Sequence, residues 1–342
     1  MNNNKEYDID DDNKIIIFQD EVIIKEQEEK EEVKKEEEKE EEEKEEEEIV
    51  VEPETNAEEE IEEDTTKYDT IVLPGGCIKG IIVLGALQYC YDNYLLTEIV
   101  NYIGTSSGAM TSFFLAIGFT PIEIICCLCT SQVMERMQHF DIFAMVNNLG
   151  ALSFTNISEC LEKMTIDKIG YLPTFHDIKH KFNKNFTCIT YNITKGEAEY
   201  ISHETHPTLP CLVAIRMSCN LPLIFENYKY CNNYYIDGGI VDNFSIDKAE
   251  SMGKKVLGIN IVFEIGKFST SDNVLEYIYK LINIPIKQQQ LNKIQNVCPK
   301  KCTIIDVYDT SAKSTFNFSI TTPDKLDMFS SGYRQIKKVI DG

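Results

Sequence analysis

The sequence predicts an α/β domain with a mainly parallel central sheet, preceded by an acidic tail. Three observations lead to this prediction. Apolar strand-like runs alternate with apolar helix-like runs from residue 68 onwards, two glycine-containing turns join early strands to helices, and nearly all net charge lies before residue 67. Because strands that alternate with helices favour parallel pairing, we expect helices on both faces of the sheet.

The first 66 residues form the acidic tail. They hold 31 of the 57 acidic residues and 8 of the 33 basic ones, which leaves 26 and 25 for positions 67–342. Residues 26–48 are almost entirely Glu and Lys, so there is no apolar stripe whose burial could offset the entropy of ordering. We expect residues 1–66 to be disordered, or at most a solvated helix with Glu–Lys pairs four apart. The functional alternative is an acidic arm that binds a basic partner.

Residues 67–342 are long enough for one large domain with a buried core. Their near-neutral charge argues against nucleic-acid binding, which needs a basic face. The N-terminus shows no signal peptide, and twelve cysteines fit reduced thiols, so we expect an intracellular protein, cytoplasmic or peripheral at a membrane. No transmembrane span is expected, because the most apolar window, residues 112–129, contains Pro121 and Glu123.

The predicted elements follow in order along the domain. Hydrophobic patterning places the first strand at 68–73, a helix at 81–96, a strand at 99–103 and a helix at 109–119. A mostly helical stretch covers 120–175, and within it 139–154 is either helix core or a flexible, membrane-facing cap. Later strands are predicted at 186–191, 199–202, 234–236, 255–262 and 302–309, and later helices at about 210–221, 271–291 and 324–340.

The glycine loop, residues 74–80 with the sequence PGGCIKG, could serve three kinds of site. Two isoleucines stand where a phosphate loop needs Lys and a hydroxyl, and adjacent glycines do not fit a dinucleotide fingerprint. A glycine turn at a helix N-terminus instead offers the backbone N–H groups of Gly75, Gly76 and Cys77 to an anion. In acyl transfer this anion is the oxyanion of the tetrahedral intermediate. Lys79 either adds positive charge there or faces solvent.

The second turn, residues 104–108 with the sequence GTSSG, is a candidate nucleophile elbow. A serine hydroxyl needs an adjacent base and a sharp, exposed turn, and flanking glycines are needed where side chains would clash. Gly104 and Gly108 meet that need around Ser106, while Ser107 lacks the flanking pattern. An ordinary strand-to-helix turn is the alternative.

The base is predicted to be a carboxylate. None of the five histidines follows a strand in the position that a Ser-His-Asp triad would use. Asp237 follows the apolar strand YYI and precedes two glycines, at a strand end where ligands collect in open α/β sheets. Partial burial would raise its pKa and make it a stronger base. A simple Asp-Gly turn is the alternative.

Taken together, four stretches resemble the patatin-like phospholipases. They are GGCIKG, GTSSG, AIRMSCNLPLIF and YYIDGGIVDNFSI, in that order, and the resemblance covers about residues 68–263. It implies a three-layer α/β/α domain, a Ser106–Asp237 dyad in place of a triad, and no metal or other cofactor. It also implies an oxyanion hole made by the backbone of the glycine loop. The sequence departs from the family pattern at two positions of the loop. Cys77 stands where the family has a glycine, and Lys79 stands where it has an arginine. Lysine cannot form the bidentate hydrogen bonds that an arginine makes.

The activity implied by this resemblance is lipid acyl hydrolysis. Ser106 would be acylated by the fatty ester of a phospholipid or lysophospholipid, and Asp237 would activate first the serine and then water. Peripheral membrane contact would accompany such a substrate. A non-catalytic lipid- or protein-binding member of the fold, or an esterase or acyltransferase on other esters, are the alternatives.

Overall fold

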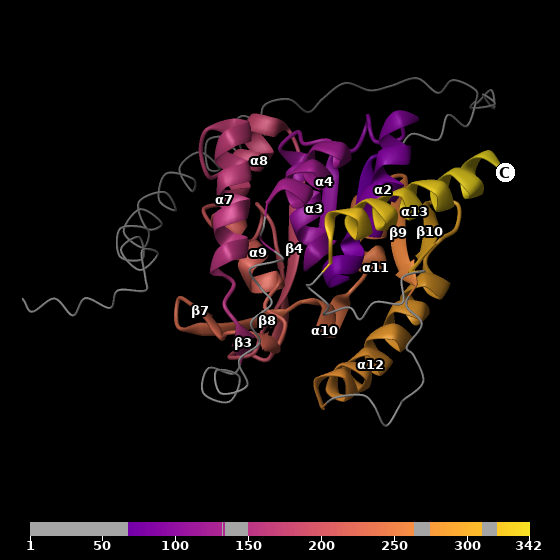
Figure 1. Cartoon of the computed structure of the whole chain (residues 1–342). Coiled ribbons are helices and arrows are strands. Elements are labelled where there is room, and N and C mark those ends of the chain that lie inside the picture. The colour runs from indigo at the N-terminus through magenta and orange to yellow at the C-terminus, as the bar shows by residue number, and fades with distance from the viewer. Residues whose placement is uncertain (1–67, 132, 134–149, 263–273, 310–319) are drawn as a thin grey trace, which may run out of the picture. The chain divides into compact units, whose positions relative to one another are not determined.

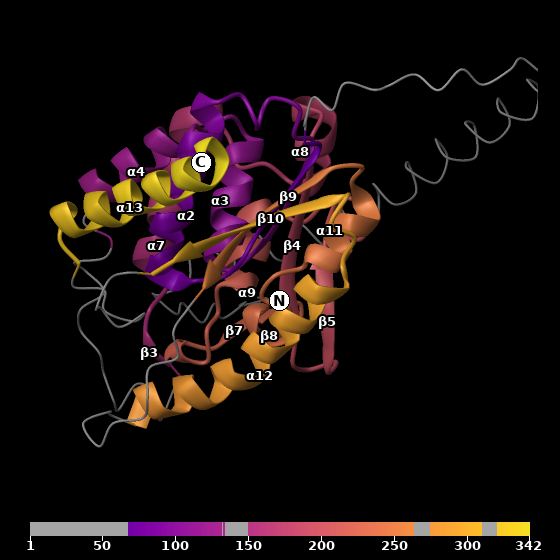
Figure 2. The ribbon, with the colours of Figure 1, turned by 90° about the vertical axis from the view of Figure 1, so that its right-hand side faces the viewer.

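Figures 1 and 2 show the computed structural model of the chain, which describes residues 68–131, 133, 150–262, 274–309 and 320–342. The predicted acidic tail, residues 1–66, lies outside the described residues, so its disorder and its basic partner stay predictions. Most of the segment 139–154 is also outside them. None of the described helices is long and apolar enough to cross a membrane.

Eight of the described strands form one sheet in the order β10-β9-β1-β2-β4-β8-β7, with β5 paired to β4. Its parallel part joins β10 to β9, β9 to β1, β1 to β2 and β2 to β4, and the other pairings are antiparallel. The predicted mainly parallel sheet is therefore confirmed. The strands are β1 (Thr70–Leu73), β2 (Asn101–Thr105), β4 (Asn185–Asn192), β5 (Glu197–Ile201), β7 (Tyr228–Tyr230), β8 (Asn233–Asp237), β9 (Val256–Val262) and β10 (Cys302–Tyr308).

Helices cover both faces of this sheet (Figure 2). Along β1, Ile71 and Leu73 join the larger apolar core and Val72 joins the second one, as expected when successive side chains point to opposite faces. The larger core takes side chains from α2 (Gly80–Asp92), α3 (Ser107–Ala116), α4 (Pro121–Thr130), α7 (Thr155–Ile169), α8 (Phe175–Phe182), α9 (Cys211–Ser218) and α13 (Thr322–Asp341). The second core takes them from α11 (Ile246–Met252) and α12 (Val274–Asn296).

The stretch that the patterning assigns to helices at 120–175 is more broken than expected. Among its described residues, Gly150–Leu152 form strand β3. This strand pairs in parallel with β6 (Leu223–Phe225), and the two make a separate two-stranded sheet. The helix-core interpretation of 139–154 is therefore wrong for these three residues. Close packing explains the glycine at 150, since a Cβ there would lie 2.0 Å from the Phe225 carbonyl oxygen.

Candidate active site

The sharp turn after β2 places Ser106 at the start of α3. Ser106 has φ 53°, a left-handed conformation that is strained for a residue with a side chain. A Cβ on Gly104 would lie 2.4 Å from the Gly108 carbonyl oxygen, and one on Gly108 would lie 2.3 Å from that of Leu73. Both glycines are thus required by backbone contact, as the elbow interpretation predicts.

The sheet register brings a second chemical group to the elbow. On β4, Ile189 pairs with Thr105, the last residue of β2, and Thr190 pairs with Asp237, the last residue of β8. Because β2 and β8 occupy successive positions along the same edge of β4, the elbow and the end of β8 meet. Residues 131 positions apart in sequence are joined in this way.

Ser106 and Asp237 form a direct hydrogen bond. The Ser106 Oγ–H donates to Asp237 Oδ2 at 2.6 Å, and Asp237 Oδ1 accepts the Gly239 N–H at 2.7 Å. Asp237 is 4% exposed. Burial raises the pKa of this carboxyl to about 6, against the opposing effect of the two hydrogen bonds. The carboxylate is therefore ionised at neutral pH and is a stronger base than an exposed aspartate.

Two polar residues, one at the end of α9 and one just after it, hold this pair in place. The Ser106 N–H donates to Ser218 Oγ at 2.8 Å, and that hydroxyl donates to the Ile189 carbonyl at 2.5 Å. The Asp237 N–H donates to the Asn220 carbonyl at 2.9 Å. The backbone of both dyad residues is thus fixed from one segment of chain.

The buried side chain of Arg216 holds the side chain of Asn220 in place. Its Nη1 donates to Asn220 Oδ1 at 2.8 Å and its Nη2 to the Glu226 carbonyl at 3.1 Å. The guanidinium lies between the rings of Phe154 and Tyr228, 4.5 Å and 4.7 Å from their centroids. Burial lowers the pKa of Arg216 to about 10, so it remains a cation at neutral pH and forms cation–π contacts.

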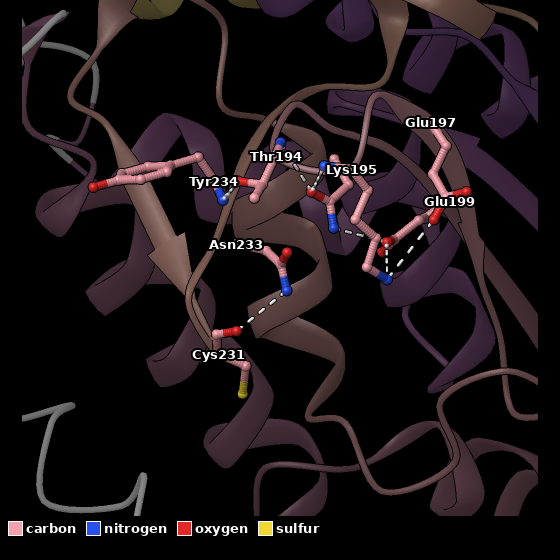
Figure 3. Close-up of polar contacts among 8 residues, drawn as sticks. Thr194, Lys195, Glu197, Glu199, Cys231, Asn233 and Tyr234 are labelled. Carbon is pink, nitrogen blue, oxygen red and sulfur yellow. Dashed lines mark hydrogen bonds and ion pairs between the residues drawn. The ribbon is translucent and has the colours of Figure 1, made fainter.

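The strand that carries Asp237 is also held at its beginning, as Figure 3 shows. The Tyr234 N–H donates at 2.8 Å to Oγ1 of Thr194, which lies in the turn between β4 and β5. In that turn, Asn192 Oδ1 accepts the N–H groups of Thr194 and Lys195 at 3.1 Å and 3.0 Å. Lys195 Nζ pairs with Glu199 at 3.1 Å. This cluster fixes the start of β8 rather than contributing to the dyad.

The glycine loop lies directly beside the elbow. Its three predicted oxyanion donors, the N–H groups of Gly75, Gly76 and Cys77, differ in whether they already have a hydrogen-bond acceptor. The Gly75 N–H donates to the Asn243 carbonyl at 3.3 Å, and Asn243 Nδ2 returns a bond to the Gly75 carbonyl at 3.2 Å. The Gly76 N–H donates to Ser107 Oγ at 3.0 Å. The Cys77 N–H has no acceptor among the described residues. Of the three, the Cys77 donor is the one open to a new ligand as the loop stands.

The two residues that depart from the resemblance lie in this loop. Cys77 has φ 50°, the left-handed region in which glycine is favoured, and burial raises its thiol pKa to about 12, so the thiol is neutral. Lys79 is 2% exposed and its Nζ pairs with the Asp309 carboxylate just beyond β10. The solvent-facing alternative for Lys79 is therefore wrong. Its ion pair joins the loop to β10, and its role in binding stays a prediction.

Sequence reasoning missed the four residues that support the dyad and the loop. Each lies inside a stretch that was singled out for other reasons, and each is a polar residue within an apolar run. Their polarity is the signal that could have found them. They are Arg216, Ser218, Asn220 and Asn243. Among the described residues, no group of three or more His, Cys, Asp or Glu could hold a metal ion.

Comparison with known proteins places the chain in a family. The profile of the family described as patatin-like phospholipase matches residues 71–249. A probable lipid hydrolase of Invertebrate iridescent virus 6 is 33% identical over 225 residues, which cover 64% of this chain and 77% of the relative. An uncharacterised protein of Acanthamoeba polyphaga mimivirus is 24% identical over 298 residues, or 84% of this chain and 98% of the relative.

Solved structures also align with the chain. VipD from Legionella pneumophila aligns with a TM-score of 0.44 at 16% identity, covering 80% of this chain and 67% of its own. Full-length ExoU of Pseudomonas aeruginosa, solved in complex with SpcU, aligns with a TM-score of 0.43 at 12% identity, covering 80% and 52%. The family profile spans more than half of the chain and includes both Ser106 and Asp237. The chain therefore belongs to the patatin-like phospholipase family of lipid hydrolases.

Proposed function

We propose that the protein hydrolyses fatty-acyl esters of phospholipids or lysophospholipids through an acyl-serine intermediate, with Ser106 and Asp237 as a catalytic dyad. The observation that carries this proposal is the 2.6 Å hydrogen bond from the Ser106 hydroxyl to a buried carboxylate. A serine on a strained elbow, paired with a base of raised pKa, has what covalent acyl transfer requires.

The first half of the reaction acylates the serine. Asp237 takes the hydroxyl proton while Ser106 Oγ attacks the ester carbonyl carbon, which gives a tetrahedral oxyanion. We place that oxyanion against the Cys77 N–H and the first-turn N–H groups of α3, where the helix dipole adds positive potential. Donors of this kind contribute on the order of 3 kcal/mol each to stabilising the transition state.

The second half returns the enzyme to its starting state. Collapse of the intermediate breaks the ester C–O bond, and Asp237 gives its proton to the leaving lysolipid alcohol. Asp237 then takes a proton from water, whose oxygen attacks the acyl carbon. The second collapse releases the fatty acid and returns the proton to Ser106 Oγ. Every proton passes between Ser106, Asp237, the leaving alcohol and water, so the reaction needs no further acid or base.

The substrate class rests on family membership and on the relative from Invertebrate iridescent virus 6, whose name describes a probable lipid hydrolase. A non-catalytic role would leave the paired Ser106 and Asp237 without a use. Hydrolysis of small soluble esters is the remaining alternative, and it differs from the proposal in substrate rather than in chemistry.

The test is fatty-acid release from mixed phospholipid vesicles by the full chain, compared with Ser106→Ala. Ser251→Ala serves as the control, because that hydroxyl is exposed and bonds to a helix carbonyl away from the dyad. Release by the parent and the control, but not by Ser106→Ala, supports the proposal. Equal release by all three contradicts it, and release from a short-chain soluble ester alone favours the esterase alternative.

A further inference from the structure

Asp242 is a buried carboxylate that the proposed chemistry does not use. It is 2% exposed, and its Oδ2 accepts hydrogen bonds from the Tyr200 hydroxyl at 2.7 Å and the Ser245 hydroxyl at 2.8 Å. The same oxygen pairs with Lys293 Nζ at 2.8 Å, while Oδ1 is buried without a hydrogen-bond partner among the described residues. Charge-assisted contacts to one buried oxygen hold this side chain in a single position.

The cation of this pair comes from α12, which packs against α10 (Gly239–Asp242), as Figure 1 shows. The side chain of Lys293 is mostly buried and pairs with two carboxylates, those of Asp242 and Asp247. Asp247 is exposed, so water and salt screen its pair with Lys293. The pair with Asp242 is buried, and breaking it would leave a charge without its partner. This buried ion pair therefore fixes α10 to α12.

The backbone of Asp242 connects the two halves of the dyad. The Thr105 hydroxyl donates to the Asp242 carbonyl at 3.0 Å, and Thr105 directly precedes Ser106. The Asp242 N–H donates to the Gly238 carbonyl at 2.8 Å, and Gly238 directly follows Asp237. A displacement of Asp242 would therefore be felt at both neighbours of the reacting groups.

Helix α10 is also the element that orients the carboxylate of the dyad. Its first residue, Gly239, donates its N–H to Asp237 Oδ1 at 2.7 Å, and this bond lowers the pKa of Asp237 against the larger effect of burial. A helix of four residues has too few internal hydrogen bonds to keep its own shape. The position of the Gly239 N–H therefore depends on contacts from outside the helix.

We propose that Asp242 and Lys293 are positioning residues, whose ion pair holds α10 so that the Gly239 N–H keeps the Asp237 carboxylate directed at Ser106. The consequence for catalysis rests on the proposed function. Among the described contacts, neither side chain of the pair bonds to Ser106 or Asp237, so the pair acts through the backbone of α10.

Positioning can be separated from a direct effect of charge. Removing the negative charge of Asp242 favours the ionised form of Asp237 and lowers its pKa, whereas removing the positive charge of Lys293 raises it. Weakening the bond from the Gly239 N–H raises the pKa in both cases. Asp242→Asn and Lys293→Met should therefore shift the Asp237 pKa in opposite directions if charge acts through space, and both upward if the pair positions α10.

The titration near pH 6 belongs to Asp237. Three thiols lie within electrostatic reach of its carboxylate, and burial raises the pKa of each, so all three stay neutral at this pH. They are those of Cys77, Cys188 and Cys219.

The test is a carbon-13 NMR titration of the full chain labelled at the aspartate side-chain carboxyls. The Asp237 signal is the one that is absent in Asp237→Asn. Its midpoint should lie at about 6 in the parent and move upward by about half a pH unit or more in both Asp242→Asn and Lys293→Met. Lys293→Arg keeps the cation and should restore the parent midpoint. Asp247→Asn is the matched control, because it removes the exposed partner of Lys293 and leaves Asp242 in place.

Ester hydrolysis and thermal unfolding of the same proteins complete the test. In Asp242→Asn and Lys293→Met, kcat for a soluble ester should fall about tenfold and KM should stay within about twofold, because the base is misplaced while substrate contacts remain. Shifts of the midpoint in opposite directions overturn the proposal. An unchanged midpoint does so too, even with a lower melting temperature, since it would leave the pair a purely structural role. If the parent hydrolyses no ester, the proposed function fails, while the titration still decides whether the pair positions Asp237.

Discussion

The elbow and the glycine loop are both turns that lead from a parallel strand into a helix, on neighbouring strands, yet they are built differently. The elbow is shaped by its own backbone, since Gly104 and Gly108 are in contact with each other and with the end of β1. The loop is held by residues far away in sequence, through the bonds of Asn243 to Gly75 and of Lys79 to Asp309.

This difference teaches where sequence motifs are informative. The elbow depends on close backbone approach at its two glycines, to each other and to the end of β1, so its glycine spacing records the geometry directly. The loop depends on partners more than 160 positions away, which no local pattern reveals. Consequently the elbow should respond to changes within its own motif, and the loop should respond to changes made elsewhere in the chain.

The largest effect on activity is expected at Asp237, the proposed base for the serine of the elbow. Asp237→Asn should lower kcat/KM by about a thousandfold or more, because the amide cannot take the serine proton. Hydrolysis of a soluble ester measures this change. A loss of less than tenfold would mean that another group is the base.

The same substitution should stabilise the folded protein at neutral pH. The folded pKa of Asp237 is raised to about 6, above the unfolded value of about 4, so its contribution to stability is present below pH 4 and lost as pH rises to 6. Asp237→Asn should therefore raise the free energy of unfolding above pH 6 by on the order of 2 kcal/mol, with little effect near pH 4. Urea unfolding at both pH values checks the sign.

Replacing one glycine in each turn by alanine should cost different amounts of stability in the elbow and in the glycine loop. Gly108→Ala should cost on the order of 3 kcal/mol, because the new Cβ would lie 2.3 Å from a backbone oxygen that cannot move alone. Gly76→Ala should cost less, since its Cβ would meet the terminal methyl of Ile261, a flexible side chain, at 2.5 Å. Urea unfolding of both variants compares them, and equal costs would contradict the distinction drawn between the turns.

A change outside the loop motif should weaken the loop. Asn243→Ala removes the side-chain donor to the Gly75 carbonyl and to Gln290, and we expect about 1 kcal/mol less stability together with about a tenfold lower kcat. Thermal unfolding and ester hydrolysis measure the two effects. Unchanged kcat would show that the loop keeps its shape without Asn243.

The smallest effect is expected at Cys77. Cys77→Gly keeps the backbone donor and relieves the strain of φ 50°, but a glycine also gains entropy in the unfolded chain. These terms oppose each other, so stability should change by less than about 1 kcal/mol and kcat by less than about threefold. A large loss of activity would instead assign a direct role to the thiol.

Most of the fold, and the pairing of Ser106 with Asp237, followed from the sequence for physical reasons. Buried parallel strands are continuous apolar runs, so β1, β4, β9 and β10 were legible from patterning. The short strands β3, β6 and β7 were not predicted, because three residues carry too little periodicity. Ser106 and Asp237 could be selected as candidates because Ser106 directly follows a strand and Asp237 ends one, each at a glycine-rich turn.

The supporting residues could not be predicted in the same way. Arg216 was part of a stretch identified as an apolar helix, and nothing local shows that it stacks between Phe154 and Tyr228. The hydrogen bonds that occupy two of the three loop donors involve Asn243 and Ser107, whose positions depend on the tertiary fold. Local sequence identifies the candidate reacting groups, whereas the residues that support them are brought in by chain topology.

The central claim is that Ser106 is a nucleophile activated by Asp237, and pH-dependent covalent labelling tests it most directly. The full chain is treated with a fluorophosphonate that reacts with activated serines, and the modified peptide and its rate of formation are followed by mass spectrometry. We predict labelling at Ser106, with a rate that rises through the Asp237 pKa of about 6 to a plateau and is nearly abolished in Asp237→Asn. Labelling at another residue, or a rate at Ser106 that Asp237→Asn leaves unchanged, would contradict the dyad.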